Sequence, residues 1–406
     1  MIHQSGRIGH FANSNAATNT AYPDALKEIL DFKDAEIAYE EISKWPGYKV
    51  TPLHPLDEIA AELGVGKIWY KDEAGRFGLG SFKALGGAYA VFMQLKEIIE
   101  SKTGKRVTID GLLARSYGPI VSKITFTCAT DGNHGRSVAW GAQIFGCQCV
   151  IYIHAQVSEG RQLAIEKLGA QVIRVAGNYD DAVRRTAVDA RNSDRIIVSD
   201  TSYEGYMTIP KFVALGYTVM LKEIINQLKG NMPTHVFLQG GVGCLASAVC
   251  AYFWQYWGDE RPRLIIVEPE AANCLQQSAR LGSPVAVKGD LVTLMAGLAC
   301  GEVSLLAWEI LSTGCDDFVT LDEGSVAPCM RLLAKGCGGD PDIVAGESAV
   351  AGLAALISAR QSADLVINLD LNSSSRVLVI GTEGATDQDL YDKLVNPGQD
   401  QSSQDK

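Results

Sequence analysis

Short apolar runs alternate along the chain with longer segments in which apolar residues return every three to four positions. The helical period is plain after Phe82, where one face carries Val91, Phe92, Leu95, Ile98 and Ile99. Strands separated by helices are typical of right-handed βαβ units and of parallel sheets. We therefore predict an α/β fold with strands at residues 124–128, 149–153, 172–175, 195–199, 235–239, 263–268, 317–321 and 376–380.

The predicted strands form two groups, one before and one after a helical stretch at residues 210–228. This grouping predicts two sheets rather than one. Residues 1–25 are polar and show no periodicity, and residues 396–406 are rich in Gln, Ser and Asp. We expect both ends to be partly disordered, because they offer few apolar side chains to hold them against a core.

Charge and composition exclude several classes of partner. The 406 residues include 36 Lys and Arg against 47 Asp and Glu, a net charge of −11 that argues against nucleic acid and membrane partners. No run approaches the ~18 apolar residues of a membrane span, and the N-terminus lacks the apolar core of a signal peptide. The ten cysteines form no C-x-x-C motif, and no cluster has metal-ligand spacing. We expect a cytoplasmic protein with mostly reduced thiols and no catalytic metal.

A first chemical candidate is Lys83, in the segment GLGSFKALGG. Ser81 is a plausible N-cap, which places Lys83 in the first helical turn. The positive end of the helix dipole and the apolar neighbours Phe82 and Leu85 would both lower the pKa of the amine. A neutral lysine is what a Schiff base to an aldehyde requires. Taken alone, the segment is more typical of a surface lysine in the first turn of a helix.

A second candidate is the segment TCATDGNHGR at residues 127–136, between a strand and a helix. The unpaired backbone amides of such a loop can hold a carboxylate. Asp131 could act as acid or base, and Asn133 could donate to a phenolic oxygen. Alternatively, these two side chains only cap the following helix.

Three more candidate segments lie just past predicted strands. Gly240, Gly241 and Gly243 open a helix and could cradle a phosphate, although such turns are often only turns. Thr382 could hydrogen-bond a heteroaromatic nitrogen, and Asp200 adds an acid. Because open parallel sheets bind ligands at the carboxyl ends of their strands, we expect these segments to meet at one site.

Together these segments resemble the fold-type II pyridoxal-phosphate enzymes, which are similar in fold to the β subunit of tryptophan synthase. Within that family the chain looks most like the diaminopropionate ammonia-lyases. The strings that carry the resemblance, in family order, are RFGLGSFKALGG, ATDGNHGRSVAWGA, NYDDAV, DTSYEGY, QGGVGCLA, EPE, MAGLACGE and AGESAVAGL. TDGNHGR, with Asp where related dehydratases carry Ser, is the most discriminating of them.

The resemblance implies a cofactor, pyridoxal 5′-phosphate, and a role for each matching residue. Lys83 would attach the cofactor and act on the Cα proton, and Asn133 would contact the cofactor's 3′-oxygen. Thr382 would lie near the pyridine nitrogen. Backbone amides for the phosphate would come from Gly240, Gly241, Val242 and Gly243.

For the substrate, the resemblance implies that Thr130 and His134 seat the carboxylate and that Asp131 and Asp200 are the acidic pair of the active site. It also implies two open, twisted, mostly parallel sheets flanked by helices. A large domain would comprise residues 26–87 and 213–395, a small domain residues 88–212, and the protein would be a homodimer. Cys274 and Cys300 lie in family-like loops and are the pair we would test for a disulfide bond.

The predicted reaction is α,β-elimination of 2,3-diaminopropionate, a small amino acid, to pyruvate and ammonia. Asp131 on the face opposite Lys83 would allow both the D and the L isomers to react. The alternative is a serine/threonine-type dehydratase on the same scaffold. A dinucleotide-dependent oxidoreductase would leave Lys83 and TDGNHGR unexplained, and a cofactor-binding protein without catalysis would leave the acids unused.

Overall fold

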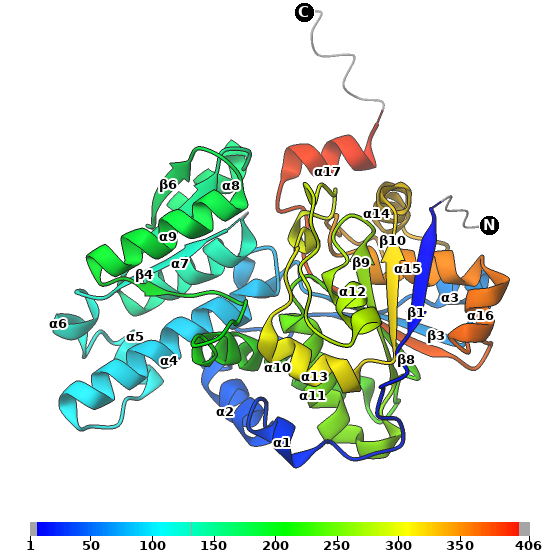
Figure 1. Ribbon diagram of the computed structural model, residues 1–406, viewed down its shortest axis with the longest axis horizontal. Helices are drawn as coiled ribbons and strands as arrows, with labels where there is room; N and C mark the ends of the chain where they lie inside the picture. The colour runs from blue at the N-terminus through cyan, green and yellow to red at the C-terminus, as the bar shows by residue number, and fades with distance from the viewer. Residues whose placement is uncertain (1–5, 131, 398–406) are drawn as a thin grey trace, which may run out of the picture.

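The computed structural model describes residues 6–130 and 132–397, and within them it contains two sheets (Figure 1). The seven-stranded sheet has the order β1-β10-β9-β8-β11-β3-β2, and the four-stranded sheet has the order β6-β5-β4-β7. The strands are β1 (Ile8–Ala12), β2 (Leu53–Pro55), β3 (Lys67–Asp72), β4 (Thr125–Ala129), β5 (Gln148–His154), β6 (Gln171–Val175), β7 (Ile196–Ile197), β8 (His235–Gln239), β9 (Arg263–Pro269), β10 (Asp317–Leu321) and β11 (Arg376–Gly381). Only β1 and β2, at the two edges of the larger sheet, run antiparallel to their neighbours.

All eight predicted strands are confirmed, as are the two sheets. Within the N-terminal 25 residues, Ile8–Ala12 are ordered and pair with β10 as an edge strand. His10 Nε2 lies 2.8 Å from the buried carboxylate of Asp317 and fixes this strand. Residues 1–5 and 398–406 lie outside the described residues.

Helices cover both sheets, and Figure 1 shows the four-stranded sheet with α7, α8 and α9 on one side of the molecule and the larger sheet on the other. The helices are α1 (Asp24–Lys27), α2 (Phe32–Ile42), α3 (Asp57–Leu63), α4 (Lys83–Thr103), α5 (Ile109–Leu113), α6 (Gly118–Val121), α7 (Asn133–Phe145), α8 (Glu159–Glu166), α9 (Tyr179–Ser193), α10 (Thr208–Leu228), α11 (Cys244–Trp257), α12 (Cys274–Leu281), α13 (Leu305–Gly314), α14 (Val326–Lys335), α15 (Ala351–Arg360), α16 (Ala363–Asn368) and α17 (Gln388–Val395). None of the helices described is long and apolar enough to cross a membrane. The domain limits at residues 88 and 212 stay a prediction.

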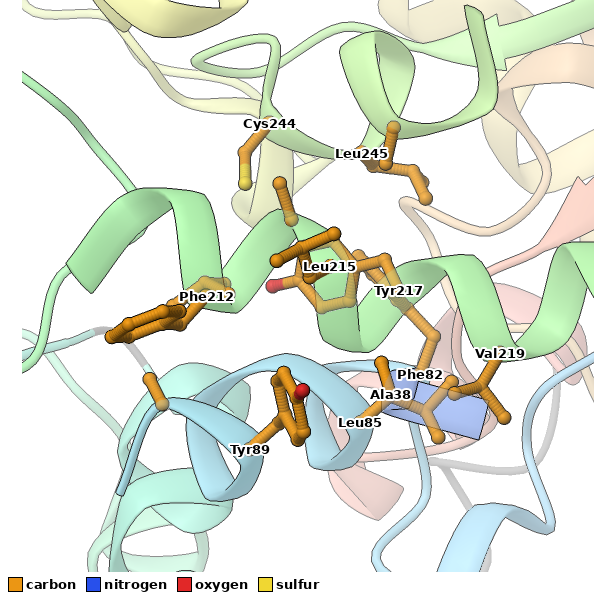
Figure 2. Packing of buried hydrophobic residues seen from close by; sticks show 14 of the residues in the cluster. Ala38, Phe82, Leu85, Tyr89, Phe212, Leu215, Tyr217, Val219, Cys244 and Leu245 are labelled. Atoms are coloured by element: carbon orange, nitrogen blue, oxygen red, sulfur yellow. The ribbon is translucent and has the colours of Figure 1, made fainter. Parts of the chain in front are cut away.

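Helix α4, which begins at Lys83, lies between α10 and α7 at unusually short range. A Cβ on Gly216 of α10 would stand 2.3 Å from the Leu85 carbonyl oxygen, and one on Gly86 would stand 2.4 Å from the Tyr217 ring. On the other side, Gly87 meets Ser137 of α7. Figure 2 shows Leu85 of α4 and Tyr217 of α10 packed together. The ALGG sequence after Lys83 is therefore required for close packing that holds the lysine's helix on two sides.

This packing predicts a stability defect for Gly216→Ala. The new methyl group would collide with backbone atoms of α4, which cannot rotate away, so we expect a loss of about 1–3 kcal/mol in the free energy of unfolding. Thermal unfolding of the apoprotein measures it. The matched control is Gly160→Ala in α8, where a Cβ meets nothing within 4 Å. We expect that variant to be as stable as the parent or more so, and equal midpoints for the two variants would contradict the packing argument.

Candidate active site

The segments that follow β4, β7, β8 and β11 meet at a cavity of about 790 Å³, as predicted. Its lining contains nearly every predicted site residue within the described part of the chain: Lys83, Thr130, Asn133, His134, Asp200, Gly240, Gly241, Val242 and Thr382. Gly243 is buried behind this wall, where it precedes α11 and packs near Ala307. Asp131 lies outside the described residues. Strand ends from both sheets therefore supply the lining, which places the cavity between them.

Lys83 forms the central ion pair of the cavity. Its Nζ lies 2.5 Å from Oδ2 of Asp200, and both side chains are mostly buried. Burial alone would lower the pKa of Lys83, but the Asp200 carboxylate outweighs it and raises that pKa well above its usual value. Burial likewise opposes ionisation of Asp200, yet the Lys83 ammonium holds the pKa of Asp200 well below its usual range.

Two predictions about Lys83 are therefore wrong. Its pKa is raised rather than lowered, because the Asp200 carboxylate at 2.5 Å outweighs the effect of burial. Ser81 is not the N-cap, since α4 begins after Phe82 and Ser81 instead pairs with Glu383 in an isolated β-bridge. The position of Lys83 in the first turn is confirmed.

Aromatic side chains form the floor beneath the lysine. The Lys83 Nζ lies 5.3 Å from the ring centroid of Phe82 and 5.8 Å from that of Tyr217. In Figure 2, Tyr217 lies between α4 and the start of α11, where Cys244 stands. These ring faces stabilise a cation at Nζ and keep water away from it. The sequence analysis missed Tyr217, which belongs to none of the motifs.

The glycine turn after β8 has the form of a phosphate site. Gly241 adopts φ +58° and Gly243 φ +94°, so the turn brings Val242 and the first residues of α11 to the cavity wall. A Cβ on Gly240 would stand 2.6 Å from the Glu268 side chain, which leaves no room for a larger residue. Backbone amides and the N-terminus of a 14-residue helix then face one region, which suits a phosphate dianion.

Glu268, in the EPE string, lies directly behind this turn. It is fully buried, and burial raises its pKa to about 8, against two hydrogen bonds from the backbone N–H groups of Leu275 and Gln276 that favour the carboxylate. A carboxyl group that is mostly protonated near neutral pH places little negative charge behind the phosphate site. The residues present therefore fit pyridoxal 5′-phosphate.

The start of α7 is capped by Thr130, a residue that the sequence analysis did not consider for this role. Thr130, buried at the end of β4, caps the helix, since its Oγ1 accepts hydrogen bonds from the backbone N–H groups of Gly132 (3.0 Å) and Gly135 (3.1 Å). Asn133 is not the cap: its Nδ2 donates to Oε2 of Glu383. Capping by Thr130 leaves the Asn133 amide available to a ligand.

His134 lines the cavity with a ring of which one nitrogen is engaged. Its Nε2 donates to the Val198 carbonyl at 2.8 Å, and its Nδ1 has no hydrogen-bond partner among the described residues. Burial lowers the pKa of His134, against the opposing effect of Asp200, so the neutral ring predominates. A neutral ring in this tautomer cannot donate to a carboxylate. The predicted role of His134 in seating the substrate carboxylate would thus require its protonation.

An ion-pair network missed by the sequence analysis crosses the cavity between the two sheets. Arg161 of α8 lies 3.1 Å from Glu347, which precedes α15, and 3.6 Å from Asp387, the N-cap of α17. Burial and the neighbouring Glu383 raise the pKa of Glu347 to about 7. Glu347 belongs to the AGESAVAGL string, so the family motif was the available signal. These contacts hold α8 against the larger sheet.

The raised pKa of Glu347 predicts a pH-dependent stability. Between pH 5 and 7 the unfolded chain has already lost this proton whereas the folded protein keeps it, so rising pH costs the folded state free energy. We expect Glu347→Gln, which cannot ionise, to gain thermal stability relative to the parent as pH rises from 5 to 7.5. Melting curves of both apoproteins across that range measure the difference. A difference that stays constant with pH would show that Glu347 ionises normally.

The remaining predictions concern Thr382, the cysteines and metal ions. Thr382 is buried at the end of β11 and lines the cavity, and its carbonyl accepts from Phe82 N. All ten cysteines are present as thiols, so Cys274 and Cys300 are not bridged here. Within residues 6–130 and 132–397, no group of three or more His, Cys, Asp or Glu side chains could hold a metal ion.

Comparison with known proteins agrees with this geometry. Residues 44–383 match the family model described as pyridoxal-phosphate dependent enzyme. The chain is 40% identical over 388 residues to diaminopropionate ammonia-lyase of Escherichia coli K12, covering 94% of this chain and 96% of the relative. It is 38% identical over 378 residues to the enzyme of that name from Salmonella typhimurium, covering 90% and 93%.

Solved structures give the same result. The Escherichia coli enzyme in complex with an aminoacrylate–PLP azomethine reaction intermediate superposes with a TM-score of 0.87 at 38% identity, covering 98% of each chain. A threonine deaminase from Solanum lycopersicum, with a TM-score of 0.73 at 18% identity over 96% and 97% of the two chains, shares the fold. The predicted fold-type II architecture is thereby confirmed. The chain belongs to the pyridoxal-phosphate-dependent enzymes and, within them, to the diaminopropionate ammonia-lyase family.

Proposed function

We propose that the protein catalyses the α,β-elimination of 2,3-diaminopropionate to pyruvate and ammonia. The observation that carries the proposal is the Lys83–Asp200 ion pair, which faces the glycine turn across one cavity. Pyridoxal 5′-phosphate, when bound, supplies the aldehyde that Lys83 attaches and the electron sink for loss of the Cα proton. Gly240, Gly241 and Val242 would hold its phosphate, and Asn133 its 3′-oxygen.

The chain's own side chains move the protons. Lys83 accepts the Cα proton at Nζ, and the aromatic faces below it stabilise the resulting ammonium. Asp200, 2.5 Å away, orients the amine and exchanges protons with it. The amino group on the substrate's Cβ leaves readily as ammonia only when it is protonated, so the site needs an acid. Asp131 and Asp200 together would provide the acid and the base. Thr382 is neutral and would not hold the pyridine nitrogen protonated.

The alternative function is a serine/threonine-type dehydratase on the same scaffold. The pair Asp131 and Asp200 favours an amine as the leaving group, because a dehydratase assisted by the cofactor phosphate has less need of two acidic residues. Pyruvate release from D- and L-diaminopropionate, measured beside serine, and 2-oxobutanoate release from threonine, separate the two functions. A higher kcat/KM with serine or threonine than with either diaminopropionate isomer would overturn the proposal.

Turnover of both isomers leads to a prediction for Asp131. If Asp131 acts on the face of the substrate opposite Lys83, Asp131→Asn should reduce turnover of one isomer by about 10²-fold more than that of the other. Steady-state pyruvate assays on the two pure isomers measure this ratio. Equal losses would show that Asp131 is not a face-specific base.

We also propose that the enzyme is a homodimer, as the family resemblance implies, and that it is cytoplasmic, as the sequence analysis expects. Sedimentation equilibrium of the holoenzyme tests the dimer, and fractionation of the native cells tests the location. A monomer at assay concentrations would contradict the proposed dimer, and recovery of the enzyme outside the cytoplasmic fraction would contradict the proposed location.

A further inference from the structure

The hydrogen bond between Asn133 and Glu383 joins the two sheets across the cavity. Asn133 is the first residue of α7, beside the four-stranded sheet, whereas Glu383 follows β11 in the seven-stranded sheet. Both residues line the cavity. The Asn133 Nδ2 donates to Oε2 of Glu383, so this amide is held from the opposite wall rather than by its own helix.

Glu383 is itself fixed in place. Its side chain is buried, its Oε1 accepts from the backbone N–H of Ser348 at 3.2 Å, and its Oε2 lies 3.5 Å from the Thr386 hydroxyl. Burial lowers the pKa of Arg136, and the Glu383 carboxylate counters that lowering. With both oxygens engaged, the carboxylate has little freedom to turn away from Asn133.

The chemistry of the pair dictates the orientation of the amide. A carboxylate offers acceptors only, so Asn133 must direct its nitrogen, not its carbonyl oxygen, at Glu383. That nitrogen keeps a second N–H, which is free to donate to a ligand oxygen in the cavity. A negative partner on the first N–H also polarises the amide group. Without Glu383, either end of the amide could face the cavity.

We propose that Glu383 is a positioning residue that sets the Asn133 amide with its N–H toward the 3′-oxygen of the cofactor. The proposal rests on the proposed function, from which the contact of Asn133 with that oxygen comes. The proposal adds Glu383, on the opposite wall of the cavity, as a residue that acts through Asn133. The contact of Asn133 with the 3′-oxygen would then depend on how closely the two sheets approach each other.

A double-mutant cycle on cofactor affinity tests the proposal. The dissociation constant of pyridoxal 5′-phosphate is measured by visible titration of the apoprotein for the parent, Glu383→Gln, Asn133→Ala and the double variant. In Glu383→Gln the new side chain keeps an oxygen for Ser348 N but would turn an NH₂ group toward Asn133. We expect each single variant to bind the cofactor roughly tenfold more weakly, and the double variant to bind no more weakly than Asn133→Ala. Glu302→Gln, at an exposed carboxylate of the cavity lining, should instead act independently of Asn133→Ala.

A swapped pair controls for folding. Asn133→Asp combined with Glu383→Gln restores a hydrogen bond of reversed polarity, so the apoprotein should regain its thermal midpoint while cofactor affinity stays low. Parent-like cofactor affinity in Glu383→Gln or in the swapped pair would overturn the proposal. So would a double variant, Glu383→Gln with Asn133→Ala, whose loss of affinity equals the product of the two single losses. Failure of the parent protein itself to bind the cofactor would instead refute the proposed function.

Discussion

Replacing Lys83 with alanine is expected to abolish the visible absorbance of the holoenzyme and to lower turnover by about 10⁴-fold or more. Lys83 provides the amine that attaches the cofactor and the base that takes the Cα proton, so its loss removes two steps at once. Absorption spectra of the protein purified with added cofactor, together with pyruvate assays, measure both effects.

A second lysine near the cavity, Lys288, provides the control for this prediction. Lys288 also lines the cavity, but it is exposed at the rim and follows no motif of the family. Lys288→Ala should therefore keep the visible absorbance, and reduction with borohydride should label Lys83 alone. If Lys288→Ala lost the visible absorbance and Lys83→Ala kept it, the cofactor would be attached to Lys288. That result would contradict the assignment of Lys83 as the cofactor lysine.

The strands that the sequence predicted correctly share one property: each is an apolar run in the parallel part of a sheet. The missed strands break that pattern. β3 (KIWYKD) contains Lys71, which is fully buried and ion-paired to Glu223 of α10 at 2.7 Å. Arg76 joins the same cluster, 2.8 Å from Glu223. A sequence window scores such residues as exposed, because the partner that neutralises them lies about 150 residues away along the chain.

The site shows the same division. Motif residues at strand ends, such as Asn133 and Gly241, could be assigned from local pattern because the backbone itself fixes where a strand end points. Contacts that cross the cavity could not. The raised pKa of Lys83 depends on Asp200, 117 positions away, and the Asn133 amide depends on Glu383. Resemblance to a family supplied Asp200 as a residue, but only the fold shows that it is the partner of the lysine.

Asp200→Asn should separate two roles that the ion pair combines. In the apoprotein the carboxylate keeps Lys83 protonated, and a protonated amine cannot attack an aldehyde. Removing the charge should lower the Lys83 pKa, so cofactor uptake should reach its half-maximal rate at least about one pH unit lower than in the parent. Once the cofactor is attached, loss of the carboxylate that orients Lys83 should reduce kcat by about 10²–10⁴-fold.

The two effects are opposite in sign, which distinguishes them from general damage to the site. Stopped-flow measurements of visible absorbance after mixing apoprotein and cofactor, repeated across pH, give the uptake profile, and steady-state assays give kcat. Asp194→Asn is the matched control, because Asp194 is exposed in the left-handed position that ends α9, where asparagine is equally suited. An uptake profile unchanged by Asp200→Asn would mean that the 2.5 Å contact does not control the protonation of Lys83. Slower uptake at every pH would assign Asp200 a role in cofactor binding in place of proton transfer.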